Sequence, residues 1–171
     1  MQALKQRIRH VPDFPKPGIL FYDVTTLMKD REGFGMAVDA MTTPHRDAKV
    51  DVVVGIESRG FIFGSAVADR LKTGFAPVRK LGKLPSKTRR AAYALEYGND
   101  SLEIHEDAVA NGQRVLVIDD LLATGGTAAA TVGLVRELGG TVVGVQFLIE
   151  LTALNGRDRL KGEHVGAVLA Y

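Results

Sequence analysis

The sequence predicts an α/β fold in which helices flank a central, mostly parallel sheet. Two short segments, 50–56 and 115–118, consist almost entirely of β-branched and other apolar residues, as strands buried on both faces do. A segment with apolar residues at helical spacing follows each of them, at 61–71 and 127–138. Strands that alternate with helices in this way indicate a parallel sheet with helices on both faces.

The N-terminal region precedes the first of these strands. Residues 2–10 have the pattern of a short amphipathic helix. Three prolines and a glycine between positions 12 and 18 predict an extended, rigid loop without regular structure. Asp30 is placed to cap a helix that runs to about Met41, and Pro44 follows the end of that helix.

The remaining strands are predicted from shorter apolar segments. Residues 75–78 form a short strand, and residues 91–97 and 102–104 form a hairpin-like excursion. The last two strands span 141–148 and 165–170. Ligands of such sheets bind at the carboxyl ends of the strands, where the strand order reverses. The polar turns that follow the strands at 50–56 and 115–118 fall at that edge.

Composition restricts the class of protein. A chain of 171 residues fits one domain with one core. The absence of cysteine excludes disulfides and thiolate metal sites. The net charge of +2 is too small to indicate nucleic-acid binding, and no apolar run approaches the roughly 20 residues of a membrane helix. The N-terminus does not resemble a secretory signal. We therefore expect a cytoplasmic enzyme that binds neither nucleic acid nor membranes.

One part of the chain is strongly cationic. The segment 79–90 contains six lysines and arginines and no acid. A cluster of this kind on a nearly neutral protein indicates an anionic ligand, although a solvated loop explains it equally well. The basic residues are Arg79, Lys80, Lys83, Lys87, Arg89 and Arg90.

The most informative stretch is VLVIDDLLATGGTAAAT, at 115–131. A strand is followed by a loop of small residues that opens a helix. The two glycines of the loop permit positive φ and leave room for a ligand, so that several backbone N–H groups can point at one phosphate at the helix start. Threonine hydroxyls add further donors. The predicted phosphate loop consists of Ala123, Thr124, Gly125, Gly126 and Thr127.

Two adjacent acids, Asp119 and Asp120, precede this loop. Carboxylates accept hydrogen bonds, so their natural targets are vicinal hydroxyls or a metal. A phosphate next to a diol indicates ribose 5-phosphate. A plain strand-to-helix turn would explain the glycines but not the paired acids. The motifs GxGxxG and GK[ST] are absent, which argues against a dinucleotide-binding turn and a P-loop.

The segment VLVIDDLLATGGT resembles the phosphoribosyl pyrophosphate signature of the type I phosphoribosyltransferases. Further blocks resemble, in the right order, those of the adenine-specific members of that family. The resemblance implies their fold as a single domain over 1–171, with an N-terminal helix and base-binding hood at about 1–30 and a flexible catalytic loop at about 79–95. The blocks are DFPKPGILFYDVT (13–25), VVGIESRGFIFG (53–64), RKLGKLP (79–85), YALEYG (93–98), LEIHEDA (102–108) and IELTALNGR (149–157).

The resemblance also implies a reaction. A pentosyltransferase of this kind moves the phosphoribosyl group of phosphoribosyl pyrophosphate to N9 of adenine, which gives AMP and pyrophosphate in purine salvage. It implies Mg²⁺ that is carried by the donor rather than by direct protein ligands, and a homodimer.

Donor and acid–base roles follow from the same resemblance. Arg59, Lys80 and Lys83 would bind pyrophosphate, and Asp119 and Asp120 the ribose. Arg59 could instead simply pair with a neighbouring acid. Glu96 is the implied acid–base residue, because a carboxylic acid near N7 of adenine can match the change in basicity as N9 reacts.

The hood would bind the base. Phe21 would stack on the purine, while backbone groups of Leu20 and Tyr22 read its edge. Phe21 could alternatively fill the core beneath the hood. Tyr22 departs from the arginine usual at its position, and Thr26 departs from a frequent proline, which puts base recognition in question.

Three other functions remain open. A phosphoribosyltransferase for hypoxanthine, guanine or xanthine has the same fold, but the YALEYG block and the hood argue against it. A non-catalytic, nucleotide-sensing regulator would need a DNA-binding module, and the residues before the first sheet strand contain no clear helix-turn-helix. An oligomeric sugar-phosphate binder is the third.

Overall fold

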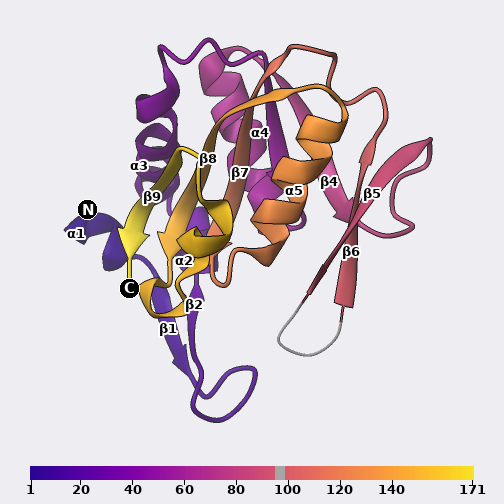
Figure 1. Cartoon of the computed structure of the whole chain (residues 1–171). Helices are drawn as coiled ribbons and strands as arrows, with labels where there is room; N and C mark the ends of the chain where they lie inside the picture. The colour runs from indigo at the N-terminus through magenta and orange to yellow at the C-terminus, as the bar shows by residue number, and fades with distance from the viewer. Residues whose placement is uncertain (95–98) are drawn as a thin grey trace.

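The computed structural model describes residues 1–94 and 99–171. Within this part of the chain, a seven-stranded sheet with the order β5-β6-β4-β3-β7-β8-β9 forms the centre (Figure 1). The strands from β4 to β9 in this order pair in parallel, which confirms the predicted α/β fold. They are β3 (Val52–Ile56), β4 (Gly74–Lys80), β7 (Arg114–Leu122), β8 (Thr141–Glu150) and β9 (Val165–Ala170).

Strand β7 is longer than the predicted 115–118. It pairs with β8 as far as Leu122, which lies opposite Glu150. Asp119 and Asp120 therefore belong to the strand itself, and the sheet fixes their backbone. The sequence underestimated the strand because charged residues interrupt its apolar pattern.

Helices cover both faces of the sheet, as predicted (Figure 1). On one face lie α3 (Arg31–Thr42) and α4 (Arg59–Leu71), where Phe63 packs in a core with Leu116 of β7. On the other lies α5 (Gly126–Glu137). Among the helices that the structure describes, none is long and apolar enough to span a membrane.

The predicted cap of α3 is confirmed. The Asp30 carboxylate accepts a hydrogen bond of 2.6 Å from the N–H of Gly33. This bond satisfies one of the free donors at the helix start.

The N-terminal region differs from the prediction. The helix over 2–10 is wrong beyond α1 (Gln2–Lys5), because the chain then turns into β1 (Arg9–Pro12). This strand pairs antiparallel with β2 (Leu20–Asp23), and the short helix α2 (Thr25–Lys29) follows. An ion pair of 2.7 Å between Arg9 and Asp23 joins the ends of the hairpin. The hood is thus a hairpin that projects from the body (Figure 1).

Within the described residues, the hairpin-like excursion is confirmed as β5 (Thr88–Ala94) and β6 (Asn99–His105), while residues 95–97 of the predicted strand lie outside them. Strand β6 also pairs antiparallel with β4, where Glu103 lies opposite Arg79. The cationic segment 79–90 was predicted to be a loop, but part of it belongs to strands β4 and β5. Both of its ends are strand, and only residues 81–87 connect them.

Candidate active site

The two polar turns meet at the carboxyl ends of β3 and β7. These strands are neighbours, and the chain builds the sheet outward from them in opposite directions, so this edge is the topological switch point. A cleft of about 400 Å³ opens there. Its lining brings together most of the predicted ribose and pyrophosphate residues. It includes Glu57, Arg59, Lys80, Asp119, Asp120 and Thr127.

The start of α4 approaches the end of β7 very closely. A Cβ atom on Gly60 would lie 2.8 Å from an Asp119 carboxylate oxygen and 3.0 Å from the carbonyl oxygen of Ile118. Only a glycine permits this approach. Gly60 therefore sets how closely the turn at 57–60 approaches the two aspartates.

The two aspartates have different surroundings. The Asp120 carboxylate forms an ion pair of 2.7 Å with Nε of Arg59, and its side chain is only 9% exposed. An Asp119 carboxylate oxygen accepts a hydrogen bond of 2.8 Å from the N–H of Asp120. Burial, followed by the negative charge of Asp120, raises the pKa of Asp119 well above its ordinary value. Arg59 does pair with a neighbouring acid, while it still lines the cleft.

The predicted phosphate loop forms a separate small pocket. Gly125 adopts φ +80° and caps α5, which begins at Gly126. All five predicted loop residues line a pocket of about 70 Å³, together with Asp119. The first N–H groups of a helix have no partner within the helix, so they can bind an anion here.

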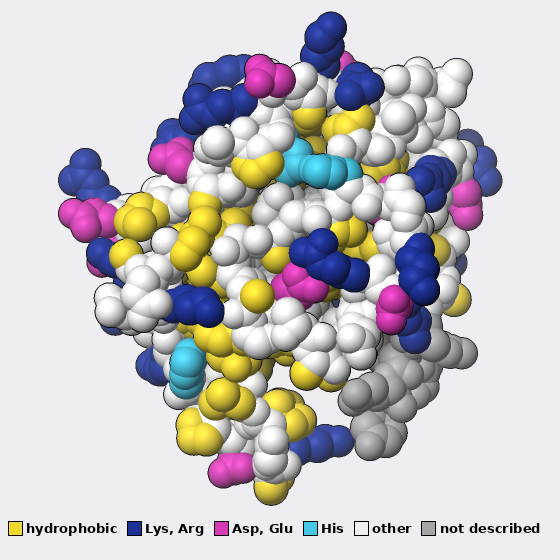
Figure 2. Space-filling view, turned by 60° about the vertical axis from the view of Figure 1, so that its left-hand side comes forward, with side chains coloured by type: hydrophobic (Ala, Val, Ile, Leu, Met, Phe, Trp, Pro, Cys, Tyr) yellow, Lys and Arg dark blue, Asp and Glu magenta, His cyan; other side chains and the backbone are white. Residues whose placement is uncertain are grey.

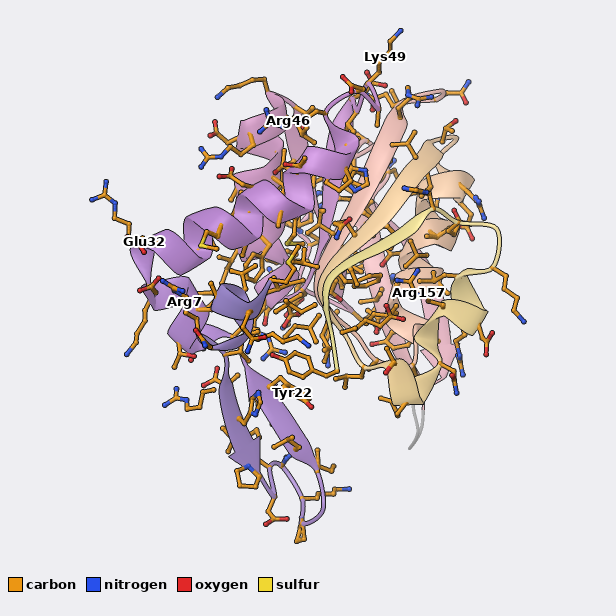
Figure 3. The ribbon with its side chains drawn as sticks, turned by 90° about the vertical axis from the view of Figure 1, so that its left-hand side faces the viewer. Arg7, Tyr22, Glu32, Arg46, Lys49 and Arg157 are labelled. Carbon is orange, nitrogen blue, oxygen red and sulfur yellow. The ribbon has the colours of Figure 1, made fainter. Side chains whose placement is uncertain are left out.

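Gly156, which the sequence analysis did not single out, supports this loop from behind. A Cβ atom on Gly125 would overlap the carbonyl oxygen of Gly156, and one on Gly156 would overlap that of Ala123. Arg157 anchors the segment through hydrogen bonds of 2.8 and 2.7 Å to the two carboxylate oxygens of Glu150 (Figure 3). The only sequence signal was the glycine within the block IELTALNGR.

Glu57 begins the turn at 57–60, which the family resemblance implies to bind diphosphate, but it was given no role of its own; in the structure it binds the cationic segment. Its buried carboxylate contacts the Lys83 ammonium and the Arg79 guanidinium, and accepts a hydrogen bond of 3.0 Å from the N–H of Lys80. Burial works to raise the pKa of Glu57, but the hydrogen bonds from Lys83 and Lys80 and the nearby cationic charges outweigh it and lower the pKa. Lys83 thus reaches the cleft edge through Glu57.

The hood forms a largely apolar pocket of about 360 Å³ beside the cleft. Phe21 lines this pocket and is half-buried, so it does not fill the core. Its ring centroid lies 5.1 Å from that of Phe14 and 5.5 Å from the Arg59 guanidinium carbon. Leu20 is exposed, and hydrophobic side chains gather on the projecting hood (Figure 2).

Tyr22 lies next to Phe21 but makes different contacts. Its ring centroid is 4.1 Å from that of Tyr171 and 5.1 Å from that of His10. Tyr22 therefore lies where the hood joins the body of the molecule (Figure 3). Glu96 lies outside the described residues, although Tyr93 from the same block lines the cleft.

Comparisons with known proteins give the family of this chain. A family model described as the phosphoribosyl transferase domain matches residues 28–163. The adenine phosphoribosyltransferase of Solibacter usitatus is 58% identical over 100% of this chain and 99% of its own length.

Solved structures show the same similarity. The adenine phosphoribosyltransferase of Rhodothermus marinus has a TM-score of 0.95 at 52% identity, with 99% of this chain and 97% of the other covered. The Saccharomyces cerevisiae enzyme, solved with an imino-altritol bisphosphate and adenine, has a TM-score of 0.94 at 40% identity, with 98% and 97% covered. The chain thus belongs to the adenine phosphoribosyltransferases of the phosphoribosyl transferase domain family.

Proposed function

We infer that this protein transfers the phosphoribosyl group of phosphoribosyl pyrophosphate to N9 of adenine, which gives AMP and pyrophosphate. One observation carries this inference: Arg59 lines both the polar cleft and the apolar hood pocket. A base in the hood and a pyrophosphate in the cleft would therefore meet at one side chain. The reacting sugar carbon would lie between them, within reach of the phosphate loop.

We propose the following donor contacts. Residues 123–127 hold the 5-phosphate through backbone N–H groups and threonine hydroxyls. Asp119 and Asp120 accept hydrogen bonds from the ribose hydroxyls. Arg59, Lys80 and Lys83 bind the leaving pyrophosphate, for which permanent or flexible cations are suited. Support comes from the grouping of these residues around the cleft and the small pocket, which share Asp119 and Thr127, and from the contact between Lys83 and Glu57 at the cleft edge.

On the adenine side, Phe21 stacks on the base, and backbone groups of Leu20 and Tyr22 read its edge. Glu96 donates a hydrogen bond toward N7 while N9 loses its proton. The position of Phe21 in the lining of the hood pocket supports its stacking role. The complex of the yeast enzyme with adenine supports adenine as the base. The role of Glu96 rests on the block YALEYG alone.

Magnesium is proposed to arrive with the donor. Within residues 1–94 and 99–171, no group of three or more His, Asp or Glu side chains is arranged to hold a metal ion. The paired acids at the cleft still fit a cation that keeps waters and substrate oxygens as most of its ligands, as magnesium commonly does. The homodimer stays a prediction from the family resemblance, and the cytoplasmic location stays a prediction from the composition.

An ultraviolet assay of the purified protein with adenine, phosphoribosyl pyrophosphate and Mg²⁺ tests the function. We expect AMP formation with adenine and little product with hypoxanthine, guanine or xanthine under the same conditions. A preference for one of these oxopurines would assign the fold to another base. Absence of product with every purine would favour a binding protein.

A further inference from the structure

We propose that Glu103 is a positioning residue that holds Lys83 in place for the pyrophosphate group from outside the cleft. Glu103 lies in β6, and no sequence motif assigned it a role. The proposal rests on the proposed function, because it concerns how the donor's pyrophosphate is bound. Of the described residues near the cleft, Glu57 lines it and Glu103 does not.

The carboxylate of Glu103 is turned toward the connection 81–87. One oxygen accepts hydrogen bonds from the backbone N–H of Lys83 at 3.0 Å and of Leu84 at 3.1 Å. The other accepts one from the Thr88 hydroxyl at 3.3 Å and lies 3.7 Å from Nε of Arg90. The side chain is only 2% exposed, so water does not compete for these contacts.

A buried carboxylate is costly unless donors surround it. Burial works to raise the pKa of Glu103, yet the N–H groups of Leu84 and Lys83, the Thr88 hydroxyl and the Arg90 charge together lower it. The carboxylate is thus charged at neutral pH. Because loss of these donors would leave a buried negative charge unpaired, the contacts with Glu103 stabilise the conformation of the connection 81–87.

Two acids consequently hold Lys83 at two points, and the Arg79 guanidinium donates a further hydrogen bond of 3.3 Å to its carbonyl oxygen. Glu103 binds its backbone N–H, and Glu57 contacts its side-chain ammonium at the cleft edge. Glu103 lies in β6, and Glu57 directly follows β3. Lys83 therefore links the β5–β6 hairpin to the carboxyl end of β3, where the cleft opens. A lysine that is already ordered loses less freedom when it binds an anion. When pyrophosphate enters, its oxygens can share the ammonium with Glu57 while Glu103 keeps the backbone in place.

The substitution Glu103→Gln tests this role with almost no change in shape. A neutral amide is a weaker acceptor for two N–H groups than a carboxylate. We expect the affinity for magnesium pyrophosphate, measured by calorimetry, to fall about tenfold, since a small misplacement of a binding group has effects of this size or larger. The KM for phosphoribosyl pyrophosphate should rise in parallel, while the affinity for AMP should stay unchanged.

A double-mutant cycle separates positioning from general damage. In a Lys83→Met background, Glu103→Gln should cause little further loss of pyrophosphate affinity, because the residue through which it acts is gone. Glu163→Gln is the matched control: this acid is also nearly buried and pairs with Arg136 at 2.7 Å. We expect that control to leave pyrophosphate affinity unchanged.

Three results would overturn the proposal: unchanged pyrophosphate affinity in Glu103→Gln, equal losses for AMP and pyrophosphate, or full additivity with Lys83→Met. If the glutamine variant does not fold, Glu103→Asp keeps the charge and withdraws it by one methylene. The same selective loss is expected there, and an unchanged affinity would equally overturn the role. Absence of AMP formation by the unmodified chain would contradict the proposed function instead.

Discussion

The carbonyl oxygen of Gly156 occupies the space that a side chain on Gly125 would need. Two glycine backbones therefore lie against each other behind the predicted phosphate loop. From the sequence, we interpreted the absence of a side chain at Gly125 as leaving room for a ligand. The structure gives a second reason, since the missing side chain would meet the protein's own backbone.

We predict that Gly125→Ala lowers both stability and AMP affinity. The positive φ alone costs about 1–2 kcal/mol for a residue with a Cβ atom, and the overlap with Gly156 adds to this cost by displacing the loop. Gly112→Ala is the matched control, because Gly112 has φ +81° with open space around its Cβ position. Thermal unfolding and calorimetry with AMP measure both effects. Equal destabilisation by the two substitutions would show that the overlap with Gly156 does not contribute to the loss of stability.

Arg59 should have separable structural and binding roles. We expect Arg59→Ala to destabilise the protein by about 1–3 kcal/mol, because it leaves the Asp120 carboxylate nearly buried without its cation. Adding Asp120→Asn should restore much of the free energy of unfolding, since the uncompensated charge is removed. The affinity for pyrophosphate should stay low in the double variant. If that affinity returned together with stability, Arg59 would be a structural residue only.

The sequence predicted those parts of the fold whose causes are local. Strands β3 and β7 are continuous apolar runs because parallel strands are buried on both faces. The loop at 123–127 could be predicted as a turn that opens a helix, because its glycines permit positive φ directly before a segment of helical spacing. The hood hairpin was missed because its strands are short and the connection between them is proline-rich. Pairs such as Arg9 with Asp23 also join residues that are distant in the chain.

Within the site, too, the residues that the sequence missed depend on contacts with distant parts of the chain. Glu57 and Glu103 look like ordinary acids in the sequence, and their importance depends on Lys83, which lies 26 and 20 residues away from them. Gly156 matters only because a loop from another part of the sheet packs on it. Such roles come from tertiary contacts, and no local pattern reveals them.

Tyr22 replaces the arginine expected at its position, and we predict that it orients the hood through Tyr171. Stacked aromatic pairs contribute about 0.5–1.5 kcal/mol beyond area burial. Tyr22→Ala should therefore raise the KM for adenine about two- to tenfold on that scale, while the KM for the donor stays constant. Tyr22→Phe keeps the ring and serves as the control. An unchanged KM for adenine in Tyr22→Ala would mean that the hood holds its position without this contact.

Glu96 is predicted to act as the acid–base residue. Glu96→Gln should reduce kcat by about 10²–10⁴-fold, the usual contribution of general acid–base catalysis. Donor affinity should be nearly intact, because the pyrophosphate and phosphate contacts are proposed for other residues. Glu106→Gln, which changes an exposed acid paired with Arg89, is the control for an altered charge in the same excursion. Unchanged turnover in Glu96→Gln would remove Glu96 from the mechanism.

His45 should make the fold sensitive to acid. Its ring is almost fully buried, and Nε2 lies 3.1 Å from the side-chain oxygen of Gln146. Burial, together with the nearby His164, lowers the pKa of His45 in the folded state. The unfolded chain therefore binds a proton more readily, so the free energy of unfolding should decrease as the pH falls below about 6.5, the ordinary pKa of histidine. His45→Gln, which cannot be protonated, should flatten the pH dependence of the urea midpoint between pH 7.5 and pH 5, whereas the substitution His164→Gln at the exposed neighbour should change it much less. The same slope in His45→Gln and the unmodified protein would assign the acid sensitivity to other groups.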